Sequence, residues 1–187
     1  TAYNADFVIP RPPPSPRIRV IPGHNQVTLE WQGAVWRDSV GCKGAWMGPE
    51  VALEIVDTQT GERTFDFEGY RVYVSEERAQ SGFRRILERD VVDGLEYDTG
   101  LDDIFYPGGR DSSVVAPVGP DTLWTDSTCT VVDTVMSRPA IQRYRYTLDG
   151  LRDGFKYWVA VTAFDRATPS VGSLESGIAQ NLQMVIP

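Results

Sequence analysis

Apolar residues alternate with polar ones along much of this chain, and this period of two constrains the fold more than any other feature. The longest example is QRYRYTLDGLRDGFKYWVAVTAFD, in which the alternation runs up to a DGLRDG corner and resumes after it. The apolar members are Tyr144, Tyr146, Leu148, Tyr157, Val159, Val161 and Ala163. Successive side chains of a strand point to opposite faces, so the pattern predicts strands with one buried face. No long segment has a convincing 3.6-residue period, so we expect an all-β sandwich.

Other segments extend this pattern. RIRVIPGHNQVTLEWQG predicts two strands about a PGHNQ turn, and VALEIVDTQTGERTFDFEGYRVYVSEE predicts a β-hairpin that leads into a further strand. GFRRILERDV is compatible with a strand or a short helix, and we favour the strand. SLESGIAQNLQMVIP supplies a last strand. Two stretches without a sustained period interrupt the strands, and we interpret them as large loop insertions at about residues 33–65 and 90–143.

The two cysteines, Cys42 and Cys129, fall one in each insertion. An even count favours a disulfide in an extracellular protein and two buried thiols in a cytosolic one. Because both lie in polar, loop-like surroundings, we expect the disulfide, which would be worth about 4 to 5 kcal/mol for a loop of this length. His24 is the one further soft ligand, too few for a structural zinc site.

The chain opens on NADFVIP, residues 4–10, followed by more prolines. The run PRPPPSP, residues 10–16, predicts a stiff polyproline linker and a boundary between an N-terminal segment, residues 1–16, and a sandwich domain, residues 17–187. NADFVIP shares four of seven positions with NLQMVIP, residues 181–187. We therefore interpret it as a strand that closes or contacts a neighbouring unit and lies outside its own sandwich. The residues of this assembly strand are Phe7, Val8, Ile9 and Pro10.

One run of the sequence resembles the signature of fibronectin type III domains. LRDGFKYWVAVTA has Leu151, Gly154 and Tyr157 at the family's spacing, followed by alternating small or branched apolar residues. Trp31 is similar to the family's buried tryptophan, and FEGYRVYVS, around Tyr70, to its third strand. The resemblance covers residues 17–32, 67–75, 144–165 and 173–187.

This resemblance implies a fibronectin type III-like, immunoglobulin-like β-sandwich with a tyrosine corner. In such a corner the ring of Tyr157 packs in the core while its hydroxyl reaches backbone upstream. It also implies a divergent module of large bacterial secreted or cell-surface proteins, in which such modules lie in tandem. The resulting hypothesis is a non-catalytic extracellular structural module in a head-to-tail array or surface filament, with neighbouring copies or modules as partners.

Charge and hydropathy exclude other classes. The formal net charge is -8, and the basic residues do not gather in a stripe, so nucleic acid is not an expected partner. The sequence has no apolar run of about 18 residues, so we expect no membrane span.

Residues suited to catalysis are sparse, and we predict no enzyme. His24 is the single histidine and lies in a turn, while Lys43 and Lys156 have polar, turn-like neighbours. The acidic pairs Asp102 with Asp103 and Asp90 with Asp93 are adjacent in sequence, which says nothing about opposition across a cleft.

Two binding alternatives remain open. No cofactor is predicted, but Asp98, Asp102, Asp103 and Asp111 lie in loops that could wrap a calcium ion, against the alternative of solvated acidic loops. Aromatic residues in the insertions could stack on a glycan or form the insertions' own small core. They are Trp36, Trp46, Phe105, Tyr106 and Trp124. A glycan-binding accessory module of a secreted enzyme or adhesin is therefore the alternative function.

Overall fold

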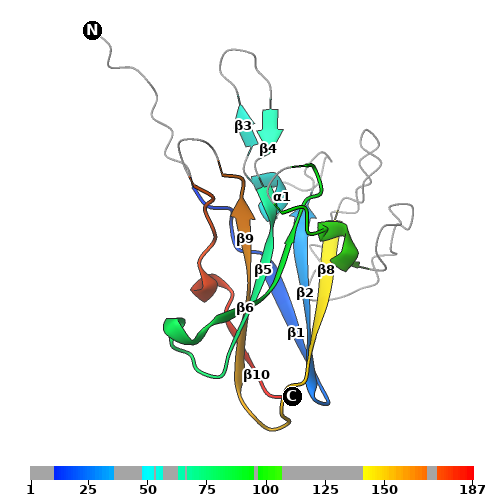
Figure 1. Ribbon diagram of the computed structural model, residues 1–187, viewed down its shortest axis with the longest axis vertical. Coiled ribbons are helices and arrows are strands. Elements are labelled where there is room, and N and C mark those ends of the chain that lie inside the picture. Colours follow the sequence, from blue (N-terminus) through cyan, green and yellow to red (C-terminus); the bar gives the residue numbers. More distant parts are fainter. Residues whose placement is uncertain are drawn as a thin grey trace.

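The predicted all-β sandwich is confirmed by the fold. The computed structural model describes residues 11–35, 48–52, 54–56, 63–65, 67–94, 97–106, 141–167 and 172–187. Eight of the described strands form two antiparallel sheets with four strands each, which pack face to face (Figure 1).

The first sheet has the strand order β1-β2-β8-β7. β1 (Arg17–Gly23) and β2 (Gln26–Val35) form the predicted hairpin about His24 and Asn25. Asn25 has a φ of 56°, and Asn tolerates this left-handed region better than most residues. β8 (Ile141–Asp149) pairs with β2, and β7 (Phe105–Tyr106) pairs with β8 at the far edge.

The second sheet has the order β10-β9-β5-β6. β5 (Phe67–Ser75) lies between β9 (Tyr157–Asp165) and β6 (Arg84–Asp90), so the strand predicted from GFRRILERDV is confirmed. β10 (Gln183–Val185) pairs with the start of β9 and supplies the expected last strand.

The remaining elements are short. β3 (Glu54–Val56) pairs with β4 (Arg63–Phe65), which confirms the predicted hairpin. Helical structure in the described residues is limited to single turns. These turns are α1 (Pro49–Ala52), η1 (Gln80–Gly82), η2 (Leu101–Ile104) and η3 (Ile178–Gln180). None of the helical turns in the described part of the chain has the length or apolar character that a bilayer crossing requires.

Strands of the first sheet extend into both predicted insertions, so the observed strand boundaries differ from the predicted ones. The expectation that Phe105 and Tyr106 lie outside the sandwich strands is wrong, because they form β7 at the edge of the first sheet. A strand of two residues is too short to produce a period in the sequence. β2 also continues to Val35 and β8 begins at Ile141, so the first sheet extends into both predicted insertions.

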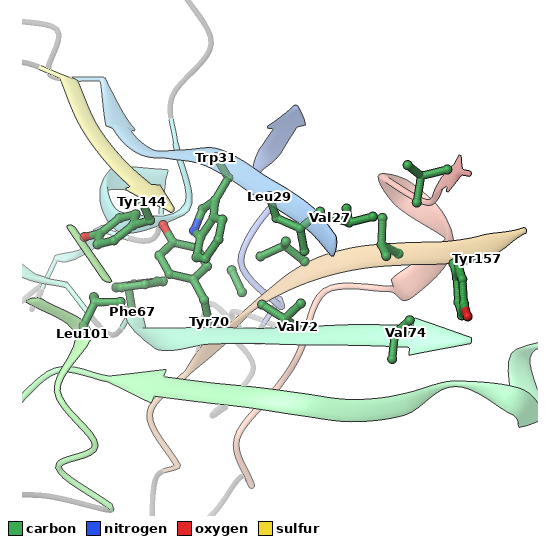
Figure 2. Close-up of a cluster of buried hydrophobic side chains, with 14 residues drawn as sticks. Val27, Leu29, Trp31, Phe67, Tyr70, Val72, Val74, Leu101, Tyr144 and Tyr157 are labelled. Atoms are coloured by element: carbon green, nitrogen blue, oxygen red, sulfur yellow. The ribbon is translucent and has the colours of Figure 1, made fainter. Parts of the chain in front are cut away.

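The core lies between the sheets and is dominated by aromatic rings from both (Figure 2). Trp31 on β2 and Tyr70 on β5 are fully buried, with ring centroids 5.6 Å apart at an interplanar angle of 72°. Trp31 also stacks on Tyr144 of β8 at 5.8 Å. Edge-to-face and offset contacts of this kind are favourable beyond the area that they bury. The aromatic cluster therefore joins the sheets at one end of the core.

Aliphatic side chains fill the rest of the core in the predicted alternation. On β9 the buried members of the hydrophobic cluster are Tyr157, Val159, Val161 and Ala163. On β2 they are Val27, Leu29 and Trp31. The intervening positions of β2, such as Thr28 and Glu30, are only partly buried, as expected for a sheet with one face against the core.

The predicted tyrosine corner is present between β8 and β9. The ring of Tyr157 is buried, and its hydroxyl oxygen accepts a hydrogen bond from the backbone N–H of Arg152 at 3.1 Å. Gly154 has a φ of 78°, which requires glycine or strain. Leu151 packs against the core, and its N–H donates to the carbonyl of Asn25 at 3.0 Å. The corner therefore ties the β8–β9 connection to the β1–β2 turn.

Removing the corner hydroxyl is expected to destabilise the module modestly. Tyr157→Phe keeps the buried ring but leaves the Arg152 N–H without its acceptor, so the free energy of unfolding should fall by about 0.5–1.5 kcal/mol. Urea unfolding followed by tryptophan fluorescence measures the change. Tyr97→Phe, at a residue that is 67% exposed, is the matched control, and equal stabilities of the two variants would contradict the role of the corner.

The proline-rich segment that precedes β1 lies against its own sandwich. Residues 11–16 form neither helix nor strand, yet Pro13 and Pro16 are buried. Ser15 Oγ donates to Gln180 Oε1 at 2.7 Å, and Asn181 Nδ2 donates to the carbonyl of Pro16 at 2.9 Å. The predicted linker is thus held in place by the C-terminal part of the chain. The predicted assembly strand, residues 4–10, lies outside the described residues.

Candidate interaction surface

The acidic residues proposed for calcium are not assembled around a common point in the described residues. Asp98 Oδ1 accepts hydrogen bonds from the N–H groups of Asp93 and Gly94, both at 2.9 Å, which makes it a loop-closing side chain. Asp102 and Asp103 lie in the first turn of η2 and are exposed. The described residues contain no group of three or more His, Cys, Asp or Glu side chains placed to hold a metal. Asp111 lies outside them.

Asp90 is buried at the end of β6, and its carboxylate organises the loop that follows. It accepts hydrogen bonds from the N–H of Tyr97 at 3.1 Å, from the hydroxyl of Thr99 at 2.6 Å and from the N–H of Thr99. Burial raises the pKa of Asp90, but these hydrogen bonds outweigh it and hold the pKa below its ordinary value. Asp93 binds the guanidinium of Arg166. The two acids therefore serve separate structural contacts.

His24 links the β1–β2 turn to the corner. Its Nδ1 lies 2.5 Å from Asp153 Oδ2, and the N–H of Asn25 donates to Asp153 Oδ1 at 2.7 Å. The bond from the Asn25 amide, followed by that from His24, lowers the pKa of Asp153. Lys156 is exposed in the same corner. Lys43 lies outside the described residues.

The outer face of the second sheet carries a network of ion pairs and hydrogen bonds that the sequence did not suggest. The guanidinium of Arg71 donates to Glu88 and to Glu175, both at 2.6 Å. The hydroxyls of Tyr73 and Thr162 donate to Glu175 Oε1 at 2.8 and 2.5 Å. The isolated bridge between Glu175 and Phe164 places the Glu175 side chain on this face.

This network packs on an aromatic ring of the outer face. The guanidinium of Arg71 lies 4.0 Å from the ring centroid of Phe164, which is fully buried. Burial, and then the hydrogen bond to Glu175, raises the pKa of Tyr73 to about 12. Arg71, Glu88 and Glu175 of this face are thus paired with one another.

A carboxylate enters the aromatic end of the core. Glu50 on α1 accepts a hydrogen bond from the hydroxyl of Tyr70 at 2.9 Å. Burial, together with the charge of Glu50, raises the pKa of Tyr70 well above its ordinary value. A Cβ at Gly33 would lie 1.8 Å from Glu50 Oε1, so the glycine makes room for this carboxylate. The contact ties α1, which lies within the first predicted insertion, to the sandwich.

The segment NLQMVIP closes the second sheet by an unusual route. The side chain of Asn181 takes the place of a strand residue beside β9: its Oδ1 accepts from the N–H of Val161 at 3.3 Å, and its Nδ2 donates to the Val161 carbonyl at 2.6 Å. The same Nδ2 also donates to Pro16, so one amide joins β9 to the proline-rich segment. This contact could not be predicted from sequence periodicity. It is made by a single side-chain amide that bonds to backbone groups, and a single residue produces no repeating pattern.

The rest of NLQMVIP completes the edge of the sheet. Val185 is buried in the core cluster, and the carbonyl of Pro187 accepts from the N–H of Gly154 at 3.1 Å. Gln183 Nε2 donates to the carbonyl of Ile18 at 3.2 Å, next to a groove of about 510 Å³ between β1 and the C-terminal segment. Asn181 thus binds β9, Val185 packs in the core, and Pro187 binds the corner through its backbone carbonyl.

Apolar side chains are exposed at the end of the sandwich where the chain of NLQMVIP finishes. Phe155, Met184 and Ile186 are 54%, 53% and 44% exposed. Two further large apolar residues of the described chain, Val92 and Tyr97, are exposed on the β6–η2 loop. The described part of β9, β10 and their corner therefore exposes these three large apolar side chains.

The remaining predicted residues divide into those outside the described part of the chain and those in the core, the corner or β7. Cys42, Cys129, Trp36, Trp46 and Trp124 lie outside the described residues. Phe105 and Tyr106 are placed by their backbone in β7. The residues that carry the family resemblance, Trp31, Tyr70, Leu151, Gly154 and Tyr157, all lie in the core or the corner.

A scan against protein-family models found no match for this chain, and searches of the curated proteins and of the solved structures also found none.

Proposed function

We propose that this chain is a fibronectin type III-like, non-catalytic structural module and one link in a head-to-tail array. The strand order supports the family type. If β1, β2 and β8 correspond to strands A, B and E, and β5, β6, β9 and β10 to C, C′, F and G, the sheets read A-B-E and G-F-C-C′. Immunoglobulin-like sandwiches use this arrangement, and the tyrosine corner at Tyr157 belongs to it.

The main support for an array is the similarity between NADFVIP and NLQMVIP, the segment that closes the second sheet. The residues that NADFVIP shares with it are Asn, Val, Ile and Pro at matching positions. Three of them correspond to Asn181, Val185 and Pro187, which bind β9, fill the core and bind the corner. Asn4 and Val8 therefore match the two side chains that close the second sheet, and Pro10 matches the residue whose backbone carbonyl binds the corner. We propose that residues 4–10 take the place of NLQMVIP in the second sheet of a neighbouring module.

The positions of the two described ends support linear growth. The segment that leads into β1 and the C-terminus lie toward opposite ends of the long axis of the sandwich (Figure 1). Modules joined through these ends would extend along one direction. We propose an extracellular or cell-surface location for such an array, with a disulfide between Cys42 and Cys129.

The proposal is tested by the mass of the protein in solution. Light scattering over a range of concentrations should show self-association of the full chain through residues 4–10. A chain that begins at Arg11 should remain monomeric, as should the Val8→Asp variant of the full chain. Both retain the docked residues 13–16, so their unfolding midpoints should match that of the full chain. Equal masses for all three proteins at every concentration would contradict the array.

A further inference from the structure

We infer that hydrogen bonds between residues 15–18 and residues 180–183 hold the segment NLQMVIP on its sheet, so that this segment and the proline-rich segment open as one unit. We call these bonds the seam. The inference goes beyond the proposed function and does not depend on an array. The bonds of the seam join Ser15 to Gln180 at 2.7 Å, Asn181 to Pro16 at 2.9 Å and Gln183 to Ile18 at 3.2 Å.

The seam keeps a constant register. The two residues of each bond are 165 positions apart in the sequence, so the two stretches run parallel to each other. Two of the bonds end on the backbone carbonyls of Pro16 and Ile18, which are two positions apart and therefore point to the same side of an extended chain. β1 and β10 are edge strands of different sheets. The seam thus joins the edges of the two sheets through side chains.

Within the described part of the chain, NLQMVIP is a short edge element. β10 has three residues and lies at the edge of its sheet. Its residues Gln183 and Met184 are exposed, and Val185 is buried. Edge elements with little buried apolar surface open at a low free energy while the rest of a protein stays folded. The bonds of the seam therefore matter for keeping this segment in place.

Asn181 couples the two segments directly. Its Nδ2 donates to the carbonyl of Val161 on β9 and to the carbonyl of Pro16, and its Oδ1 accepts from the N–H of Val161. When this amide leaves β9, it therefore also leaves Pro16. Coupling between two equilibria is reciprocal, so release of the proline-rich segment must weaken the hold on NLQMVIP.

The space beside the seam is not filled by packed side chains. A groove of about 510 Å³ lies there, and its lining includes Ile18 and Val20 of β1 together with Gln180, Asn181 and Gln183. Protein interiors are close-packed, and this packing is what resists local opening elsewhere in the sandwich. The two sheet edges are therefore held here by the hydrogen bonds of the seam more than by packing.

The opening unit has a boundary on the N-terminal side of η3. The N–H of Ser176 donates to the carbonyl of Ala163 at 2.9 Å, and the N–H of Ala163 donates to Ser176 Oγ at 2.9 Å. Glu175 is bound to Arg71 on the outer face of the sheet. The chain up to Ser176 is thus anchored independently of the seam, and η3 is the place where the unit can swing.

Amide hydrogen exchange in the full chain, followed residue by residue by NMR, tests the seam. Pro13→Asp places a charge at a buried position of the proline-rich segment and should release it from the sandwich. Pro12→Asp, at the exposed neighbouring residue, is the matched control. The reporters are the N–H groups of Val161 and Gly154, which bind the two ends of NLQMVIP.

In Pro13→Asp the two reporter amides should exchange about tenfold faster than in the wild type, and in Pro12→Asp at the wild-type rate. The amides of Ser176 and Leu151 lie outside the opening unit and should keep their rates. Ser15→Ala removes one bond of the seam and should accelerate the reporters about threefold. Unchanged reporters in Pro13→Asp or in Ser15→Ala would overturn the inference. Equal acceleration of all four amides would also overturn it, because the whole sandwich would then be opening.

Discussion

Val185→Asp is expected to lower the free energy of unfolding by about 3–5 kcal/mol. Val185 is 6% exposed within the core cluster, so an ionised carboxylate there would lose its water and lie among apolar side chains. Urea unfolding at neutral pH measures the effect. The loss in free energy of unfolding is limited, because β10 can detach from β9 and carry the new charge into water. Detachment occurs when it requires less free energy than burying the carboxylate.

The matched control is Met184→Asp, one residue earlier on the exposed side of the same strand. Met184 is 53% exposed, so its replacement should change stability by less than about 0.5 kcal/mol. Under the array proposal, Val185→Asp should also promote self-association, because residues 4–10 of another copy then face a weaker competitor. Adding Val8→Asp to Val185→Asp should abolish that association. Equal stability of the Val185 and Met184 variants would show that NLQMVIP does not close the core.

Asp90→Asn is the second large expected effect, at about 2–4 kcal/mol. An amide in place of the carboxylate supplies one acceptor oxygen but turns a donor toward the N–H groups and the hydroxyl that Asp90 accepts from Tyr97 and Thr99. Hydrogen exchange of the Tyr97 and Thr99 amides should accelerate together with the loss of stability. Asp102→Asn, at an exposed acid of the same region, is the control and should be neutral.

The same carboxylate predicts an acid-dependent loss of stability. The folded-state pKa of Asp90 lies below its ordinary value, so its contribution is present above that value and is lost as the pH falls through the lowered pKa. The unfolding midpoint of the wild type should decline below about pH 4, and Asp90→Asn should remove part of that decline. Parallel pH profiles for the two proteins would contradict this assignment.

The strands and the corner were predictable because each follows from a local pattern. Alternation predicted β2, β5, β8 and β9, the DGLRDG run predicted a corner, and the resemblance of Leu151, Gly154 and Tyr157 to a family signature implied a hydroxyl contact there, which is present. These features depend on short-range rules of side-chain direction and turn geometry. The predicted disulfide and assembly strand concern residues that the structure does not describe, so they stay predictions.

Other features were not accessible from the sequence because they join positions far apart without any repeat. Glu50 meets Tyr70 only because α1 is placed across the end of the sheets, and Gly33 leaves the necessary space. Asn181 reaches β9 and the proline-rich segment through one amide. The Arg71 network needs residues from β5, β6 and the segment before β10. Such contacts are consequences of tertiary arrangement, which single-sequence patterns do not contain.

The break in the closing strand has a consequence for aggregation. Beside β9, backbone pairing occurs near Phe164 and again near Val159, while η3 and the amide of Asn181 occupy the region between them. At the other sheet, Pro22 on β1 lacks an N–H where an incoming strand would need one. A β-strand of another molecule therefore cannot form a continuous series of backbone hydrogen bonds at either of these two edges. Lateral pairing of sandwiches through β1 or through β10 is therefore discouraged.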